Sequence, residues 1–305
     1  MTLPPSTAIL MAAYGTVERL DRVAEFLRDV AGGREPSPDL VAEMRRRYEA
    51  IGGSPLIRIT MAQAAALEAE LARRGRPRAV VVGMRHSAPR LADAVRRIAA
   101  DGHRAMTVLV MAPHYSALSI GRYRECVQEA LSGLADPPAA RWIERWWHQP
   151  RLAEAFEVRI WAALAAHGWV PDDVRVVFTA HSLPVRIREM GDPYEEEVRA
   201  HARALAQRLR LPDWALAFQS AGASGEPWLG PDLGEALAAT AAEGRRRVLV
   251  APIGFACDHL EILFDLDIEM RRRAGELGLE FARTESLNVS APFIAALADA
   301  VEQVG

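Results

Sequence analysis

The β/α organisation of the chain is clearest at Arg247-Val-Leu-Val-Ala-Pro-Ile-Gly-Phe255, a β-rich apolar run that leads directly into a helical segment, residues 259–273. Short β-branched runs alternate with amphipathic stretches in both directions from this point. This alternation is typical of parallel sheets flanked by helices. The sequence predicts strands at residues 8–12, 79–83, 106–111, 174–179, 215–219, 247–251 and 279–282. It predicts helices at residues 18–30, 38–50, 62–74, 90–100, 121–131, 151–167, 194–208, 231–243, 259–273 and 292–304.

Two pairs of strand ends resemble one another and indicate an internal duplication. The run Ile-Leu-Met-Ala-Ala-Tyr14-Gly resembles Val-Val-Phe-Thr-Ala-His181-Ser, and Val-Leu-Val-Met-Ala-Pro113 resembles Val-Leu-Val-Ala-Pro252. We therefore expect an α/β fold of two similar doubly wound, Rossmann-like halves, residues 1–149 and 150–305, with the active-site cleft between them. The boundary follows the tryptophan-rich run Arg141-Trp-Ile-Glu-Arg-Trp-Trp147, for which core or interdomain packing is a better interpretation than an aromatic ligand platform.

The segment after Phe255 carries a ladder of carboxylates. Glu261, Asp265 and Glu269 are four residues apart, so an α-helix would stack them on one face with roughly 6 Å of rise at each step. Like charges in this arrangement repel, so a bound cation would offset them. Oxygen ligands suit a divalent metal ion in this role. The alternative is the solvated face of an amphipathic helix. The position favours a site, because open α/β sheets bind ligands beyond the carboxyl ends of their strands.

Composition excludes several classes of protein. The chain has 305 residues, 50% of them apolar, which is enough for a large core or two domains. Its 37 Lys and Arg against 40 Asp and Glu give a net charge of -3 without a basic block, so nucleic acid is not an expected partner. Residues 1–6 lack the features of a signal peptide, and no apolar run approaches the ~20 residues of a membrane span. We expect a cytoplasmic protein without membrane insertion.

The two cysteines, Cys126 and Cys257, are far apart and show no C-x-x-C spacing. Neither a structural zinc site nor a cysteine-held iron–sulfur cluster is therefore expected within one chain. Both are expected to be buried free thiols.

Taken together, six blocks of sequence resemble the ferrochelatase family, over residues 8 to 303. They are Ala13-Tyr-Gly-Thr16, Arg47-Tyr-Glu-Ala-Ile-Gly-Gly-Ser-Pro-Leu56, Ala112-Pro-His-Tyr-Ser116, Phe178-Thr-Ala-His-Ser-Leu-Pro184, Gln219-Ser220 with Trp228-Leu-Gly-Pro-Asp232, and Gly254-Phe255 with Asp258-His-Leu-Glu261. The resemblance implies a lyase of haem biosynthesis that inserts Fe²⁺ into a porphyrin with release of two protons. It also implies that Fe²⁺ is a substrate and that no prosthetic group is needed.

The resemblance assigns catalysis to His181 and Glu261, and contact with the metal to His181, Glu261, Asp265 and Glu269. The residue types fit this chemistry, because metallation must remove two pyrrole protons and strip water from Fe²⁺. A neutral imidazole can take the protons, and carboxylates can relay cation or proton. Imidazole and carboxylate also hold Fe²⁺ loosely enough to release it. For His181 alone, the alternative is a hydrogen-bonded structural residue at the end of a strand.

Within the family, the chain is most similar to the compact bacterial coproporphyrin III ferrochelatases, whose substrate bears four propionates. Tyr14 resembles the tyrosine that faces the metal from the opposite side of the ring. Further positions match porphyrin contacts: Arg47, Tyr48, Ser54, Tyr123 and, as a second-rank residue, His86. An ordinary solvated helix face would also explain Arg47, and a strand-terminal hydrogen bond would explain His86. Where close relatives have an arginine pair, this chain reads Val30-Ala-Gly-Gly-Arg34, so Arg34 or Arg28 would have to substitute.

Three alternatives stay open from the sequence. The substrate could be protoporphyrin IX, the metal could be cobalt or nickel, or the chain could be a non-catalytic haem or metal carrier on the same fold. Retention of both His181 and Glu261 argues against a carrier, which needs an axial ligand but no base. Expected partners are the porphyrin and Fe²⁺, with transient contact to neighbouring enzymes of haem biosynthesis.

Overall fold

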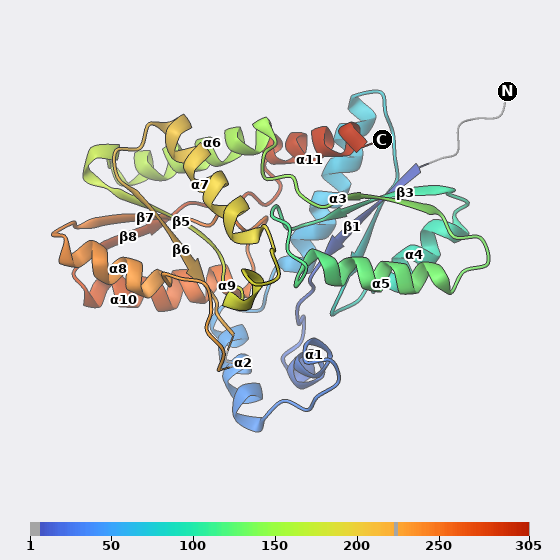
Figure 1. Ribbon diagram of the computed structural model, residues 1–305, viewed down its shortest axis with the longest axis horizontal. Coiled ribbons are helices and arrows are strands. Elements are labelled where there is room, and N and C mark those ends of the chain that lie inside the picture. The colour runs from blue at the N-terminus through green and yellow to red at the C-terminus, as the bar shows by residue number, and fades with distance from the viewer. Residues whose placement is uncertain (1–6, 223–224, 305) are drawn as a thin grey trace. The chain divides into compact units, whose positions relative to one another are not determined.

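The structure, a computed structural model, describes residues 7–222 and 225–304. Its contacts divide the chain into two compact units: unit 1, Met1–Gln149 with Asn288–Gly305, and unit 2, Pro150–Leu287. Each unit contains a four-stranded parallel sheet flanked by helices (Figure 1). The expected α/β fold of two doubly wound halves is confirmed. The expected second half, 150–305, differs from unit 2 in its last segment, which returns to unit 1.

The two sheets have the same topology. Unit 1 contains β1 (Thr7–Ala13), β2 (Val80–Met84), β3 (Ala105–Val110) and β4 (Ala139–Ile143), in the order β2-β1-β3-β4. Unit 2 contains β5 (Arg175–His181), β6 (Trp214–Gln219), β7 (Arg247–Ala251) and β8 (Glu280–Arg283), in the order β6-β5-β7-β8. In each sheet the second strand along the chain pairs with one side of the first strand, and the third strand pairs with its other side. The switch points therefore lie between β1 and β3 and between β5 and β7.

The central strands that were predicted are almost completely buried. Every residue from Ala8 to Ala13 in β1, and from Val176 to Ala180 in β5, is buried, and such strands read as continuous apolar runs. β4 was missed because its exposed and partly buried residues alternate, so it does not read as an apolar run. Its neighbour Trp146 is a core residue, 1% exposed, with Nε1 donating to the carbonyl of Val110 over 2.9 Å.

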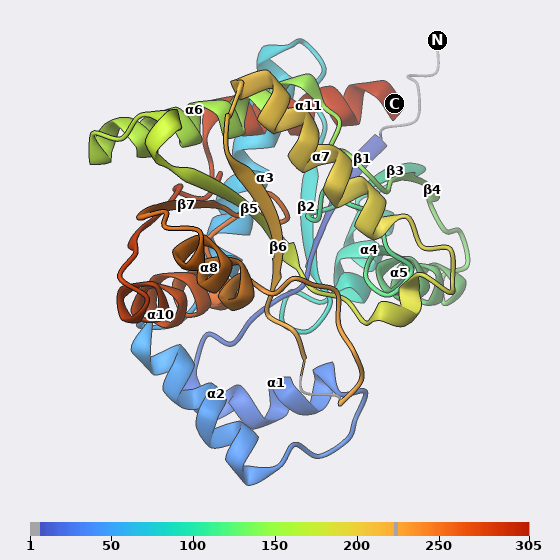
Figure 2. The ribbon, with the colours of Figure 1, turned by 60° about the vertical axis from the view of Figure 1, so that its left-hand side comes forward.

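Unit 1 packs helices on both faces of its sheet. Its helices are η1 (Leu20–Arg22), α1 (Val23–Val30), α2 (Pro38–Ala50), α3 (Leu56–Arg73), α4 (Leu91–Ala100), α5 (Ile120–Ser132) and α11 (Ala291–Val304). Helices α4 and α5 cover one face, and α3 and α11 cover the other. Helices α1 and α2 lie side by side beyond the carboxyl end of β1 (Figure 2). Helix α2 carries Arg47 and Tyr48, which the sequence analysis matched to porphyrin contacts.

Unit 2 contains α6 (Pro150–His167), η2 (Pro171–Asp173), η3 (Val185–Ile187), α7 (Tyr194–Leu209), α8 (Leu233–Ala242), α9 (Leu260–Leu263), η4 (Asp265–Met270) and α10 (Arg271–Glu276). The helix predicted over 259–273 is thus divided into three parts, and η4 is a π-helix. Residues of α8, α9, η4 and α10 pack against one face of the sheet. None of the described helices in either unit is long and apolar enough to cross a membrane.

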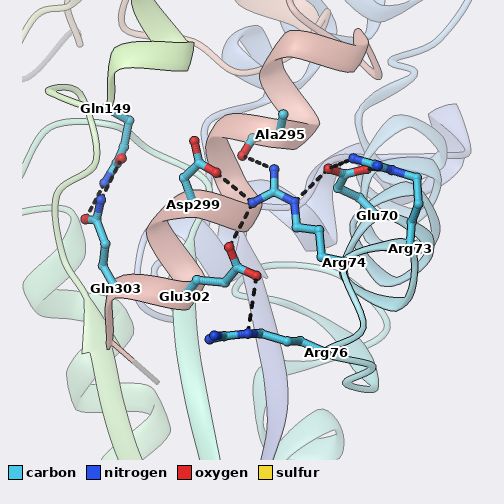
Figure 3. Close-up of polar contacts among 9 residues, drawn as sticks. All are labelled: Glu70, Arg73, Arg74, Arg76, Gln149, Ala295, Asp299, Glu302 and Gln303. Carbon is cyan, nitrogen blue, oxygen red and sulfur yellow. Dashed lines mark hydrogen bonds and ion pairs between the residues drawn. The ribbon is translucent and has the colours of Figure 1, made fainter.

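An ion-pair network fixes the last helix to unit 1 (Figure 3). Arg74, at the end of α3, lies 2.6 Å from Asp299 and 2.9 Å from Glu302 of α11, and 2.7 Å from Glu70 of its own helix. Its Nη2 also donates to the carbonyl of Ala295. The Arg74 side chain is only 16% exposed, so these contacts satisfy a charge that is largely removed from water.

Candidate active site

His181 and Glu261 come together at the switch point of the unit 2 sheet. His181 is the last residue of β5, and Glu261 lies in α9, shortly after β7. Because β5 and β7 are parallel neighbours, their carboxyl ends open at the same edge of the sheet. The His181 Nε2 and Glu261 Oε1 atoms are 3.6 Å apart. The structure therefore brings together the two residues that the sequence analysis assigned to catalysis.

Gly254 allows the chain after β7 to cross closely over the end of β5. A Cβ at this position would lie 2.7 Å from the Cβ and 2.8 Å from the Cα of Ala180. The Gly254 N–H also donates to the carbonyl of Thr179 over 3.1 Å. A larger residue would push the segment that carries Glu261 away from His181, so this glycine is required by packing.

The hydrogen bonds of His181 determine which ring nitrogen can act as a base. Nδ1 lies against the carbonyl of Ser182, and the His181 carbonyl accepts a 2.7 Å hydrogen bond from the Tyr194 hydroxyl. Because a carbonyl can only accept, Nδ1 must carry the proton of the neutral ring. The lone pair of neutral His181 is therefore on Nε2, which faces Glu261.

His259 repeats this arrangement on the other side of the same carboxylate. Its Nδ1 lies 3.0 Å from the carbonyl of Cys257, and its Nε2 lies 3.6 Å from Glu261 Oε2. Each oxygen of Glu261 thus faces the Nε2 atom of a different imidazole. The sequence analysis did not assign His259 to the site, although the block Asp258-His-Leu-Glu261 contained it.

Electrostatics of the pair favour a proton on His181 and a charge on Glu261. Burial alone would lower the pKa of His181, but the Glu261 carboxylate and the Ser182 carbonyl outweigh it, and the pKa is raised. Burial alone would raise the pKa of Glu261, but the imidazoles of His181 and His259 hold the pKa far below its usual value. Glu261 is therefore a carboxylate at neutral pH, and His181 accepts a proton more readily than a free imidazole does.

The acidic ladder continues into the π-helix η4. The Glu269 N–H donates to the carbonyl of Phe264, five residues earlier, over 3.0 Å. Asp265 accepts a 2.5 Å hydrogen bond from the Ser220 hydroxyl, in the loop after β6. Glu261, Asp265 and Glu269 are all half-buried, whereas a solvated helix face would expose them. π-turns inside helices occur frequently at functional sites.

Across residues 7–222 and 225–304, no three His, Cys, Asp or Glu side chains are grouped so as to hold a metal ion. The metal-contacting set His181, Glu261, Asp265 and Glu269 therefore stays a prediction.

In unit 1, Tyr14 and His86 lie together beyond the carboxyl ends of the neighbouring strands β1 and β2. The His86 N–H donates to the Tyr14 carbonyl over 2.9 Å, and the two ring centroids are 4.6 Å apart. Tyr14 is 42% exposed, whereas His86 is buried. His86 Nδ1 lies 2.7 Å from Asp29 at the end of α1, and burial lowers the pKa of His86 more than Asp29 raises it. A cavity of about 300 Å³ adjoins His86, Asp29 and Arg90.

The other predicted porphyrin contacts have partners inside unit 1. The Tyr48 hydroxyl lies 3.1 Å from Thr16 Oγ1, and Tyr48 is 3% exposed. Tyr123 belongs to the core packed against α4 and α5, and burial raises its pKa. Arg47 donates to Glu43 over 2.8 Å, and Ser54 Oγ accepts from the Leu56 N–H at the start of α3. Their contact with a porphyrin stays a prediction.

The comparison with known proteins decides the family. The profile of the family described as Ferrochelatase matches residues 6–304. The chain belongs to the ferrochelatase family. It is 43% identical to the ferrochelatase of Herpetosiphon aurantiacus, over 94% of this chain and 95% of that protein. The ferrochelatase of Thermus thermophilus shares 40% identity over 96% and 98% of the two chains. The coproporphyrin III ferrochelatase of Geobacillus kaustophilus shares 35% over 97% and 95%.

Solved chelatases share the fold of this ferrochelatase. The sirohydrochlorin chelatase SirB from Bacillus subtilis subspecies spizizenii aligns with a TM-score of 0.59 at 13% identity, over 98% of this chain and 94% of that one. CbiX aligns with a TM-score of 0.56 at 14% identity, over 97% and 98% of the two chains. The prediction of a ferrochelatase is confirmed: the protein is an enzyme, a lyase that inserts iron into a porphyrin.

Several residues around the ferrochelatase site had no signal of their own in the sequence. Ser220 and Gln219 lie in one of the six blocks that resemble the family, but only the fold places Ser220 on Asp265 and the Gln219 amide on the carbonyl of Glu261, 3.0 Å away. Tyr194 reaches His181 from the start of α7. Asp29, which contacts His86, lies in a stretch that reads as an ordinary helix end.

Proposed function

We propose that this ferrochelatase inserts Fe²⁺ into coproporphyrin III, giving coprohaem and two protons. The observation that carries the insertion step is the 3.6 Å approach of His181 Nε2 to the carboxylate of Glu261. In this proposal Nε2 accepts a proton as a pyrrole N–H bond breaks, and Glu261 stabilises the resulting imidazolium. The deprotonated ring nitrogens then bind Fe²⁺. His259 lies on the other oxygen of Glu261 and can take part in the same proton transfer.

Fe²⁺ approaches this pair along Glu269, Asp265 and Glu261. The three carboxylates are half-buried and follow one another along η4 and α9. A series of single carboxylates binds a divalent cation weakly, so the ion can move on to the four nitrogens of the porphyrin.

The choice of coproporphyrin III is supported by relatives and by polar groups in unit 1. Relatives named coproporphyrin III ferrochelatase match nearly the whole chain at 32–35% identity. Tyr14 is exposed at the end of β1. Arg28 and Arg34, which flank the missing arginine pair, are available near the surface, with Arg28 paired to exposed Glu35. Each charge-assisted contact to a propionate would contribute about 1.5–3 kcal/mol.

Protoporphyrin IX is the second candidate substrate. Ala31 and Gly32 stand where an arginine pair was expected, and the relatives at 43% and 40% identity are named ferrochelatase without a stated porphyrin. We expect a higher kcat/KM for coproporphyrin III than for protoporphyrin IX when both are tested anaerobically with Fe²⁺ by absorption spectroscopy. An equal or higher value for protoporphyrin IX would reverse the substrate assignment. Product formed only in stoichiometric amounts would favour a carrier.

We also propose that the reaction uses no prosthetic group. Cys126 belongs to unit 1 and Cys257 to unit 2, and burial raises the pKa of the Cys257 thiol to about 12. A thiol that resists deprotonation is a poor ligand for an iron–sulfur cluster, which binds thiolates. Iron and sulfide analysis of the purified enzyme tests this directly.

A further inference from the structure

Asp267 lies in the middle of the π-helix but is outside the series Glu261, Asp265 and Glu269. Both of its carboxylate oxygens are bound by Arg283, the last residue of β8: Nε and Nη2 donate to Oδ1 and Oδ2, each over 2.8 Å. The Arg283 side chain is 13% exposed. A bidentate, largely buried arginine–carboxylate pair constrains direction as well as distance.

The same guanidinium reaches the residue that begins the catalytic segment. Arg283 Nη2 lies 3.3 Å from Asp258 Oδ1, and the Ser286 hydroxyl donates to that oxygen over 2.7 Å. Arg283 Nη1 donates to the carbonyl of Thr284 over 2.9 Å, which fixes the side chain to its own strand end. One side chain therefore joins Asp258, three residues before Glu261, to the centre of η4.

The π-helix needs such an external constraint. Its i→i+5 hydrogen bonds are rare, and locally unfavourable backbone persists only where the surroundings over-determine it. Ile262 and Leu266 are fully buried against the sheet and hold one side of the segment. Ser220 holds Asp265. Arg283 binds and neutralises Asp267, so this carboxylate does not compete with Asp265 for a cation.

We propose that Arg283 is a positioning residue of metal insertion. By binding Asp258 and Asp267 together, it fixes the turn that carries Glu261 and the π-helical register that places Asp265 behind it, and so sets the enzyme's affinity for Fe²⁺. This inference rests on the roles proposed above for Glu261 and Asp265. Arg283 acts through the two aspartates.

The test is steady-state kinetics of Arg283→Gln and Arg283→Lys with Fe²⁺ and porphyrin varied separately. Glutamine cannot bridge the two aspartates, so the KM for Fe²⁺ should rise about tenfold or more, while the KM for the porphyrin stays unchanged. Lysine keeps the charge but not the bidentate geometry, so its KM for Fe²⁺ should lie between those of the wild type and Arg283→Gln. Asp267→Asn should reproduce the effect of Arg283→Gln, and the double variant should be little worse than either single one.

Arg175→Gln is the matched control. Arg175 is also on a strand of unit 2, is 14% exposed, and bridges two acids, Asp213 at 2.9 Å and Glu243 at 2.5 Å. It lies at the opposite, amino end of β5, so its loss should lower the melting temperature and leave the KM for Fe²⁺ unchanged. Arg271→Gln is a second control. Arg271 is exposed, and its Nη2 lies 3.7 Å from Asp267 Oδ1.

A merely structural role predicts that Arg283→Gln and Arg175→Gln lose stability alike and that neither changes the KM for Fe²⁺. This result would overturn the proposal, as would an equal rise in both KM values. If Arg283→Gln does not fold, Arg283→Lys and Asp267→Asn decide the question by the same KM comparison. Glu261→Gln, assayed alongside, distinguishes failure of the proposed function from failure of the positioning role of Arg283. Normal turnover of that variant contradicts the proposed function, whereas an inactive Glu261→Gln with unaltered Arg283 and Asp267 variants contradicts only the positioning role.

Discussion

Two backbone carbonyls set the protonation of the candidate site. The carbonyls of Ser182 and Cys257 each face the Nδ1 atom of an imidazole, and His181 and His259 therefore both direct Nε2 toward Glu261. One carboxylate therefore faces the Nε2 atoms of two imidazoles. In the proposed reaction two protons leave the porphyrin, and these two imidazoles are the candidate bases for them.

His181→Ala should lower kcat for metal insertion by about 10²–10⁴-fold, because it removes a principal general base. Porphyrin affinity should stay close to that of the wild type, since the imidazole acts on the pyrrole protons and the metal. Initial rates and fluorescence titration with porphyrin measure the two quantities. His259→Ala is the informative comparison, because it leaves Nε2 of His181 in place. Near-normal turnover of His181→Ala would exclude the assigned role.

The pKa of His181 should lie above that of a free histidine and should fall in Glu261→Gln. The sign follows from charge: the carboxylate stabilises the imidazolium and raises the pKa, so an amide removes that stabilisation. The stability that the pair contributes is therefore present below the unfolded pKa of about 6.5 and is lost as pH rises through the raised folded value. NMR titration of the ring protons measures the pKa. His86, whose pKa is lowered, should not change, and an unchanged His181 pKa would contradict the coupling.

At the scale of one element, two series of residues in α9 and η4 repeat at a spacing of four. The acids Glu261, Asp265 and Glu269 and the apolar residues Ile262, Leu266 and Met270 both repeat at this spacing. In an α-helix of 3.6 residues per turn, such a series drifts by about 40° at each step. A wider turn with i→i+5 hydrogen bonds reduces this drift. The core contacts of Ile262 and Leu266 and the acidic series then stay on separate faces.

The double variant Asp265→Asn with Glu269→Gln tests the cation path. Amides keep the shape but lose the charge, so the Fe²⁺ concentration for half-maximal rate should rise while porphyrin affinity is unchanged. Glu261→Gln should be much more severe, because that residue also acts on His181. A purely solvated acidic face predicts instead an unchanged Fe²⁺ curve and a gain of about 0.2–0.5 kcal/mol in stability from removing like charges.

At the scale of the whole molecule, the duplication places Tyr14 and His181 at equivalent positions. Tyr14 directly follows β1 and His181 is the last residue of β5, and the two sheets have the same strand order. The exception to the duplication is the C-terminal segment, which leaves unit 2 after Leu287 and ends on unit 1.

Arg74→Gln should destabilise unit 1 by about 1.5–3 kcal/mol, because Asp299 and Glu302 lose a charged donor that is largely buried. Arg73→Gln is the control. Arg73 binds the same Glu70 but is 72% exposed, so its loss should change the stability by less than about 1 kcal/mol. Denaturant unfolding of both variants gives the comparison. Equal effects would show that the network does not hold α11.

Much of this protein could be predicted from local sequence. Seven of the strands read as short apolar runs, so these strands, the doubly wound class and the strand ends at Tyr14 and His181 follow from the pattern. His181 and Glu261 were predicted from sequence blocks that resemble the family, and the structure places them side by side.

Other features depend on contacts between distant residues, which no local pattern contains. The edge strand β4 forms because β3 offers it hydrogen bonds, and α11 joins unit 1 because Arg74 and the sheet lie there. The π-helix η4 is joined to the end of β8 by Arg283, sixteen residues beyond Asp267 in the chain. The approach of Glu261 to His181 depends on the close crossing at Gly254. Sequence alone determined which chemical groups are present and on which elements; the tertiary structure decided their partners, because hydrogen bonds and packing act between neighbours in space.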